Sequence, residues 1–320
     1  PSNLFFIRPR RFGKSIFLSM LRAYYDIAQK EKFDKRFGNL WIGSHPTPMQ
    51  GQYQVLYLDF SRASGGNGSL AENFDRYCSM AMDVFGKVYE PYYFPGYAKK
   101  MEAQPDFVSK LNYLNFHSAE YGAKLYLIID EYDNFTNVVL NEQGNEIYHA
   151  LTHASGFYRE IFKKFKGMFE RIFMTGVSPV TLDDLTSGFN IGWNISTDHR
   201  FNMMLGFSET DVRTMFNYYK EVGKLPADAD IDAMIQEMKP WYDNYCFAEE
   251  SLGHDPKIFN CDMVLYYLRN YMTLGKSPKE MIDPNTRTDY NKMKRLIQLD
   301  KLDGNRKGVL RKITEEGQIV

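Results

Sequence analysis

Residues 8–15 read Arg-Pro-Arg-Arg-Phe-Gly-Lys-Ser, and this stretch lies between two segments of different pattern. The short apolar run Leu4–Ile7 precedes it, and Ile16–Tyr25 follows it with apolar residues at helical spacing. This order predicts a strand, a loop and a helix. The glycine allows a tight turn that points successive backbone N–H groups to one side, and the helix directs the positive end of its dipole to the same place. The stretch therefore predicts an anion-binding loop.

The end of this stretch matches the phosphate-binding loop (P-loop) pattern G-x-x-x-x-G-K-[ST], although Arg8 stands where the pattern has its first glycine. In this interpretation Lys14 contacts the β- and γ-phosphates of a nucleotide and Ser15 offers its hydroxyl to Mg²⁺. The arginines contact phosphate, or else bond helix ends or a partner surface. The expected nucleotide-binding residues are Arg10, Arg11, Phe12, Gly13, Lys14, Ser15 and Ile16.

A second part of the site is predicted after the apolar run Leu125–Ile129, which is typical of a central parallel strand covered on both faces. Asp130 follows it directly, as the carboxylate of a Walker B motif does, and is expected to hold Mg²⁺ together with Ser15. The adjacent Glu131 is expected to orient and deprotonate the attacking water. The expected catalytic residues are thus Glu131 and Lys14, with Thr175 at the end of the next strand sensing the γ-phosphate and Ser178 as the second candidate. The alternative for Thr175 and Ser178 is that they only form the turn after this strand.

The remaining pattern predicts an α/β fold: a three-layer P-loop sandwich with a mostly parallel sheet. Further strands are expected at Val55–Phe60, Arg171–Thr175 and Asn202–Gly206, and helices at Ala71–Val88, Phe107–Tyr121 and Phe157–Phe169. After Phe207 the pattern becomes helical, at Glu209–Val222, Ile231–Asp243 and Asp262–Thr273. We therefore expect a P-loop core at residues 1–207 and a smaller helical lid and C-terminal region at residues 208–320.

Five motifs resemble the bacterial AAA-ATPase-like family: residues 8–15, Ile-Asp-Glu-Tyr-Asp at 129–133, Phe-Met-Thr-Gly-Val-Ser at 173–178, Met-Leu-Gly-Phe-Ser-Glu-Thr-Asp-Val at 204–212 and Trp-Tyr-Asp-Asn-Tyr-Cys-Phe at 241–247. In the last of these, Asn244 stands where the family usually has glycine. The resemblance implies a P-loop ATPase of the additional-strand, conserved-glutamate class with a helical lid. It implies that Gly13, Lys14 and Ser15 bind ATP and Mg²⁺, that Asp130 assists the metal and that Glu131 is the base. Members of the family often continue into a PD-(D/E)xK nuclease-like domain, which would be expected to begin near Val320.

Composition excludes several other classes of protein. The chain has 39 Lys and Arg against 40 Asp and Glu, so its overall charge gives no reason to expect nucleic-acid or membrane binding. No apolar run approaches the length that a bilayer requires. The three cysteines form no CxxC pair and indicate neither a disulfide framework nor a zinc site, which favours a cytoplasmic location. The basic segment 287–312 either contacts nucleic acid or is a solvated lid or linker helix.

Two other patterns are weak. His149 and His153, with Glu146, lack a third ligand for zinc, and the Glu-x-Lys at 237–239 lies in a helical stretch rather than in a nuclease strand. Three hypotheses follow: an ATPase coupled to a partner or an appended effector domain, a nucleotide-gated switch with little turnover, and an ATPase that regulates a nuclease. An arginine finger is expected from the lid, with Arg213 as the candidate, or from a neighbouring subunit; the oligomeric state stays open.

Overall fold

The computed structural model describes residues 2–63, 67–134, 157–177, 192–254 and 257–283, and every structural statement below concerns these residues. Several sequence-based predictions lie outside them. These are the second sensor candidate Ser178, the histidine pair His149 and His153 with Glu146, and the basic segment 287–312.

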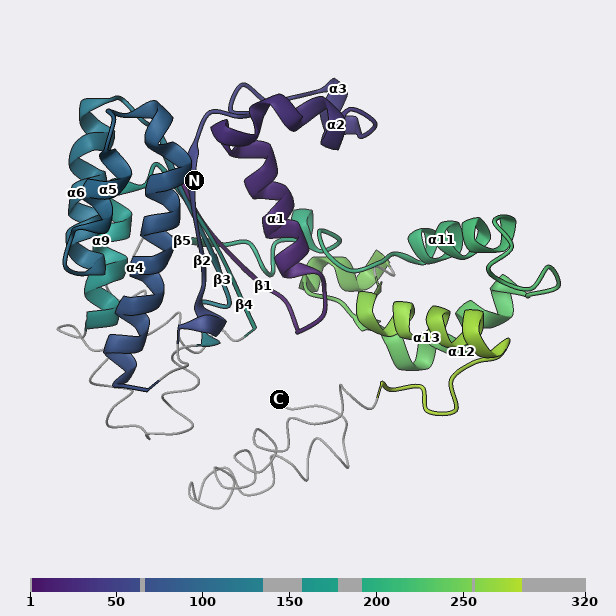
Figure 1. The fold of residues 1–320 in the computed structure, drawn as a ribbon. Coiled ribbons are helices and arrows are strands. Elements are labelled where there is room, and N and C mark those ends of the chain that lie inside the picture. The colour runs from purple at the N-terminus through teal and green to yellow at the C-terminus, as the bar shows by residue number, and fades with distance from the viewer. Residues whose placement is uncertain (1, 64–66, 135–156, 178–191, 255–256, 284–320) are drawn as a thin grey trace, which may run out of the picture. The chain divides into compact units, whose positions relative to one another are not determined.

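A five-stranded sheet forms the centre of the fold (Figure 1). Its strands, in spatial order, are β2 (Gln54–Asp59), β3 (Leu125–Asp130), β4 (Arg171–Gly176), β1 (Asn3–Ile7) and β5 (Gly192–Asn194). All neighbouring pairs are parallel. β4 lies between β1 and β3 as the additional strand that the family resemblance implies. The predicted α/β class with a mostly parallel sheet is confirmed.

Helices cover both faces of the sheet (Figure 1). Helix α1 (Lys14–Tyr25) packs on one face, and the other carries α4 (Leu70–Tyr89), α5 (Tyr97–Glu102), α6 (Phe107–Glu120) and α9 (Phe157–Met168). The short helices α2 (Phe33–Phe37) and α3 (Trp41–Ser44) and the 3₁₀ turns η1 (Ile27–Lys32), η2 (Phe60–Arg62) and η3 (Glu90–Tyr92) connect these elements. The predicted three-layer sandwich is therefore present.

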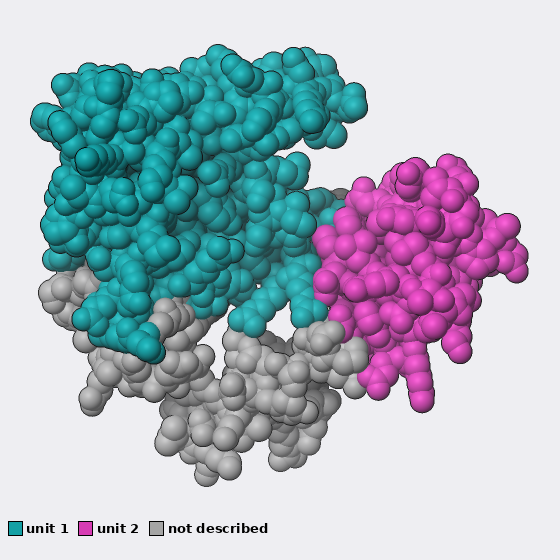
Figure 2. Space-filling model, in the orientation of Figure 1, with its two compact units in different colours: residues 1–206, 246–256 teal, residues 207–245, 257–320 magenta. Residues whose placement is uncertain are grey.

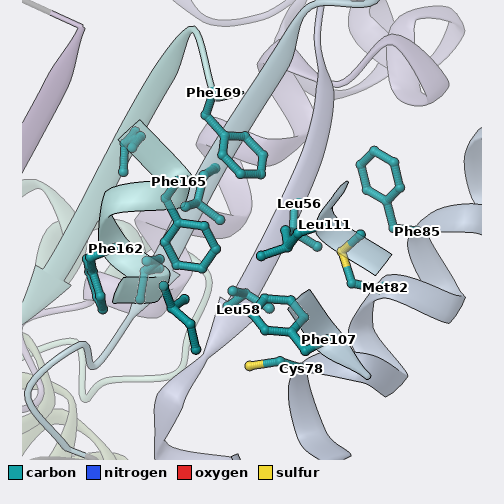
Figure 3. Packing of buried hydrophobic residues seen from close by; sticks show 14 of the residues in the cluster. Leu56, Leu58, Cys78, Met82, Phe85, Phe107, Leu111, Phe162, Phe165 and Phe169 are labelled. Carbon is teal, nitrogen blue, oxygen red and sulfur yellow. The ribbon is translucent and has the colours of Figure 1, made fainter. Parts of the chain in front are cut away.

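Side-chain alternation along β3 explains why two layers can pack on one sheet. Leu125, Leu127 and Ile129 belong to the larger core under α4, α6 and α9, whereas Tyr126 and Ile128 belong to the core on the α1 side. Figure 3 shows the larger core, in which phenylalanine rings from α9 pack near leucines of β2 and apolar side chains of α4 and α6. Because the alternation has a period of two, the next residue, Asp130, projects to the α1 face.

The chain divides into two compact units (Figure 2). Unit 1 comprises residues 1–206 and 246–256, and unit 2 comprises residues 207–245 and 257–320. The first unit also contains η4 (His199–Phe201) and η5 (Glu249–His254). The predicted boundary near residue 207 lies beside the first of these divisions, but the return of 246–256 to unit 1 is a feature that the sequence did not indicate.

Unit 2 consists mainly of helices, as its sequence pattern suggested. It holds α11 (Glu209–Glu221), α12 (Ile231–Tyr242) and α13 (Cys261–Leu274), packed around a core that includes Phe216, Met238 and Tyr267. The strands β6 (Asp243–Tyr245) and β7 (Ile258–Phe259) form a small antiparallel pair that the sequence did not predict. A lid function for this unit stays a prediction. None of the described helices is both long enough and apolar enough to cross a membrane.

One predicted strand is wrong. Residues 202–206 form turns rather than a strand, and the fifth strand is Gly192–Asn194. The Asp198 carboxylate accepts the Arg200 N–H and starts a 3₁₀ turn, and the chain continues to curl because the Met204 N–H bonds to the Phe201 oxygen. The apolar residues of this segment therefore fill a turn that packs on the α1-side core.

Candidate functional site

The loop between β1 and α1 takes the conformation of an anion-binding turn. Gly13 precedes α1 with φ of 87°, and Arg11 also has a positive φ of 70°. No side chain caps the start of α1, and its first helical bond runs from the Phe17 N–H to the Gly13 oxygen. The N–H groups of the first turn, at residues 14–16, thus have no partner within the helix. Such groups, together with the helix dipole, attract an anion.

Lys14 is buried at the start of this helix, where its ammonium closes the loop. Nζ donates to the backbone oxygen of Arg8 at 2.9 Å and to that of Pro9 at 3.0 Å, which uses two of its three N–H bonds. Burial lowers the pKa of Lys14, while the carboxylates of Glu131 and Asp130, and of Asp133 to a smaller extent, oppose that shift. The lysine therefore lies within the field of the acidic residues that follow β3.

Asp130 is the centre of a hydrogen-bond network that joins three strands to α1. Its carboxylate is buried and accepts the Ser15 hydroxyl at 2.5 Å and the Thr175 hydroxyl at 2.7 Å. Tyr57 of β2 donates to the same carboxylate at 3.3 Å, and the Glu131 N–H donates at 3.0 Å. The structure thus brings the predicted metal-binding pair and the predicted sensor into direct contact.

Glu131 lies at the turn that follows β3 and has a positive φ of 50°. Its carboxylate accepts the side-chain amide of Asn134 at 2.9 Å. The turn is tied to the next strand because the Tyr132 N–H donates to the Thr175 oxygen at 3.0 Å. Glu131 is therefore fixed beside Asp130 at the carboxyl end of the sheet, where parallel-sheet proteins place their ligands.

Three polar residues at this edge were not singled out from the sequence. Tyr57 reaches Asp130 from β2, and Asn134 bonds to Glu131. Asp133 is buried, and its two carboxylate oxygens accept the Val177 N–H at 3.2 and 3.1 Å. Asp133 could have been recognised from the sequence, because it is a further aspartate three residues after Asp130, where the chain should already leave the sheet.

The arginines of the loop have different surroundings. Arg8 is completely buried, and its terminal nitrogens donate to backbone oxygens of residues 7, 196 and 201. Arg10 and Arg11 are exposed. Phe12 is completely buried, which leaves only its backbone for a ligand, and the Ile16 side chain is 71% exposed. Of the three loop arginines, Arg10 and Arg11 stay candidates for phosphate.

A hollow of about 860 Å³ opens beside Ser15 and Asp130. Its floor is the edge strand β2, and its walls are α1 and α4. Three arginines, Arg22, Arg36 and Arg62, line it together with the apolar side of α4. The site therefore has room next to the predicted metal position.

Unit 2 contains the arginine-finger candidate and the Glu-x-Lys pattern, and in both cases the side chains are paired within the unit. Arg213 bonds to Glu209 at 3.0 Å and to Asp232 at 2.6 Å. Glu237 accepts the Tyr267 hydroxyl at 2.6 Å, and Lys239 pairs with Glu209 at 2.8 Å. Arg213 would have to leave two carboxylates before it could act on a phosphate.

Comparison with known proteins gives two matches. The family model described as "Predicted AAA-ATPase" matches residues 1–186, which include the loop, β3 and β4. A protein of Azotobacter chroococcum mcd 1, described as "Uncharacterized protein in vnfD 5'region", is 26% identical over 259 residues. That match covers 78% of this chain and 43% of the relative, so the chain spans less than half the length of the relative.

Proposed function

The chain belongs to the family of predicted AAA-ATPases, and from this premise we propose that it binds ATP with Mg²⁺ and hydrolyses it. One observation carries the proposal: the Ser15 hydroxyl, in the loop after β1, bonds at 2.5 Å to the Asp130 carboxylate, at the end of β3. The two residues are 115 positions apart, and their contact supports the proposal because the sequence predicts each of them separately as part of a P-loop site.

The residues present fit Mg²⁺. A hydroxyl and a carboxylate, from Ser15 and Asp130, supply the hard oxygen atoms that this ion prefers. Within the described residues no three His, Cys, Asp or Glu side chains form a metal cluster, so Mg²⁺ here would complete its shell with phosphate oxygens and water. When bound, the ion would neutralise charge that develops on the phosphates.

The protein residues would then divide the work. Lys14 and the N–H groups of the first turn of α1 bind the β- and γ-phosphates. Thr175 and Tyr57 orient Asp130 through their hydroxyls. Glu131 positions a water molecule and takes its proton as the water oxygen bonds to the γ-phosphorus and the bond to ADP breaks.

A second candidate, a nucleotide-gated switch with little turnover, is favoured by the bond between Asn134 and Glu131. The amide occupies one oxygen of the carboxylate at 2.9 Å, which restrains the group that must accept the proton. In this version ATP stays bound until the Asn134 contact opens. Replacing Asn134 with alanine should then raise turnover above that of the wild type, whereas in the first version it should leave turnover equal or lower.

The central test is ATP turnover of the purified chain. Lys14→Ala should lose both binding and turnover, and Glu131→Gln should bind ATP but lose turnover. The exposed residues Lys35 and Glu31 provide matched controls, since Lys35→Ala and Glu31→Gln remove the same charges elsewhere on unit 1. Equal turnover in the wild type and in both site variants would contradict the ATPase, and calorimetry without any ATP affinity would exclude the switch as well.

We further propose that the nucleotide state is coupled to a partner or to an appended effector domain, including the nuclease regulation considered above. The match covers only 43% of the Azotobacter relative, so that relative has further sequence in which an effector domain could lie. If the 320-residue chain bound DNA at low salt no better than a neutral control protein does, a direct nucleic-acid role for these residues would fail.

A further inference from the structure

The buried side chain of Arg8 lies among aromatic rings and carbonyl oxygens. Its terminal nitrogens donate to the backbone oxygens of Ser196 and Phe201, each at 2.8 Å. Its guanidinium carbon lies 4.1 Å from the centre of the Phe6 ring and 3.9 Å from that of the Phe247 ring. Burial lowers the pKa of Arg8 to about 10, which leaves the group charged at neutral pH. The two ring faces thus stabilise a desolvated cation.

Phe247 contacts both ends of the phosphate loop. Its ring lies over Arg8, the first residue of the loop, and meets Phe12 edge to face with centres 5.6 Å apart. Its backbone is also held: the N–H groups of Phe247 and Ala248 donate to the side-chain oxygen of the buried Asn202 at 2.8 and 3.1 Å. An aromatic ring on a fixed backbone therefore braces a loop that lies 239 residues earlier in the chain.

The brace extends to the phosphate-binding lysine. Lys14 donates to the backbone oxygens of Arg8 and Pro9, so the position of Arg8 determines where those two acceptors lie. Without the Phe247 ring, Arg8 would lose one of its two aromatic faces and Phe12 would lose its edge contact. The loop could then take other conformations, in which Lys14 and the first-turn N–H groups no longer converge.

We propose that Phe247 is a positioning residue of the nucleotide site: it holds the loop of residues 8–13, and through it Lys14, in the conformation that binds phosphate. The inference rests on the function proposed above. The segment 246–256 belongs to unit 1, while the residues on both sides of it belong to unit 2. The proposal gives a functional reason for this arrangement, because the segment supplies Phe247 to the loop. Only Cys246 separates Phe247 from Tyr245, the last residue of β6, so we expect nucleotide binding at the loop to affect the backbone of β6 as well.

The test compares three substitutions at one position. Phe247→Ala removes the ring, Phe247→Leu keeps apolar bulk without a π face, and Phe247→Tyr keeps the ring. The Kd for ATP in the presence of MgCl₂, measured by calorimetry on folded protein, should rise about 5- to 30-fold in the alanine variant, the fold-change expected for a desolvated cation–π contact. The leucine variant should lie between alanine and wild type, and the tyrosine variant should stay near wild type.

A matched control separates positioning from general loss of packing. Phe165 is a completely buried ring in the α9 core of the same unit, and Phe165→Ala should lower stability without changing the Kd of the folded fraction. If Phe247→Ala does not fold, the leucine variant replaces it. A leucine or alanine variant that folds and binds ATP with the wild-type Kd would overturn the proposal.

Amide hydrogen exchange without nucleotide distinguishes this proposal from the ATPase itself. The amides of residues 8 and 10–14 should exchange faster in Phe247→Leu than in the wild type. The amides of residues 243–245 should respond to ATP in the wild type but not in the variant. Faster loop exchange in a chain whose wild type binds no ATP would support the brace and contradict the nucleotide function. If loop exchange were unchanged in Phe247→Leu while the chain still bound ATP, the result would contradict the brace and support the nucleotide function.

Discussion

Replacing Thr175 with valine should slow the proposed ATP hydrolysis much more than it weakens ATP binding. Thr175 is completely buried, and its hydroxyl donates to Asp130 at 2.7 Å. The acceptor is a carboxylate that is only 3% exposed, so the loss of this donor leaves a nearly buried charge with one hydrogen bond fewer. Valine retains the branched shape but presents a methyl group to the carboxylate. The Asp130 side chain then loses one of the contacts that fix its direction.

The magnitude follows from the kind of bond. A hydrogen bond to a charged group contributes about 1.5–3 kcal/mol. If that amount is lost from the transition state, where Asp130 must hold Mg²⁺ in position, kcat falls about 10- to 150-fold. If it is lost from the folded state, the melting temperature falls about 3–12 °C for a unit of this size. Both effects are large enough to measure separately.

The assay measures kcat, the Mg²⁺ concentration for half-maximal turnover and the Kd for ATP. Thr175→Ser is the matched control because it keeps the hydroxyl and removes only a methyl group. We expect the valine variant to need more Mg²⁺ and to turn over slowly, and the serine variant to resemble the wild type. Wild-type kcat and Mg²⁺ dependence in Thr175→Val would refute this reasoning. If the serine variant were as slow as the valine variant, the methyl packing and not the hydroxyl would be responsible.

Three further predictions concern the same site. Burial lowers the pKa of Lys14 and a bound anion favours its charged form, so ATP affinity should fall as pH rises through that lowered pKa. Calorimetry over a series of alkaline pH values, in buffers of different ionisation enthalpy, should detect proton uptake on binding, and no proton uptake at any of them would contradict this prediction. Gly13→Ala should cost about 1–2 kcal/mol in urea unfolding because φ is 87°, although the new Cβ would meet no other described residue within 4 Å apart from its chain neighbours. If the loop binds phosphate as proposed, ATP affinity should fall by more than this loss of stability, and equal losses would argue against the proposal. Asp133→Asn should lower the free energy of unfolding by about 1–3 kcal/mol, because the Val177 N–H loses a charged acceptor. Urea unfolding measures this loss, and an unchanged midpoint would contradict the prediction.

The central fold could be predicted because its signals are local. A continuous apolar run such as Leu125–Ile129 can be stable only where both faces are covered, and the helices between such runs supply that cover. The carboxyl ends of parallel strands meet at one edge, so the loop with Ser15 and the acid at 130 could be expected to approach each other. The 2.5 Å bond between them has the geometry that this argument requires.

The role of Arg8 could not be predicted because its surroundings come from distant parts of the chain. By charge alone, an arginine in a P-loop is a phosphate ligand. Its partners are the backbone oxygens of Ser196 and Phe201 and the ring of Phe247. The sequence around Arg8 contains no pattern that predicts these contacts. A short motif records which residue types are present, whereas burial is decided by the remaining fold.

The edge strand β5 was missed for a related reason. Its three residues, Gly-Trp-Asn, have no alternating pattern, and they form a strand because β1 offers a free edge. Gly192 fits there because a Cβ would lie 1.7 Å from an atom of the Phe5 ring. Asn202–Gly206, which has more apolar residues, forms a turn instead. Strand formation at a sheet edge is thus set by the available partner more than by the propensity of the strand itself.

The charges of the site are separated in a way that suits a metal–phosphate pair. On one side lie Lys14 and the first-turn N–H groups of α1, which have no partner within the helix, and on the other lie the carboxylates of Asp130 and Glu131. The buried Asp130 takes hydroxyl donors and a backbone N–H, which satisfy its oxygens but do not cancel its charge. A free anion would suit only the first side and a free cation only the second. Mg²⁺ bound to a triphosphate carries both signs in contact. The proposed ligand would therefore place a charge of opposite sign beside each half of the site and stabilise both halves at once.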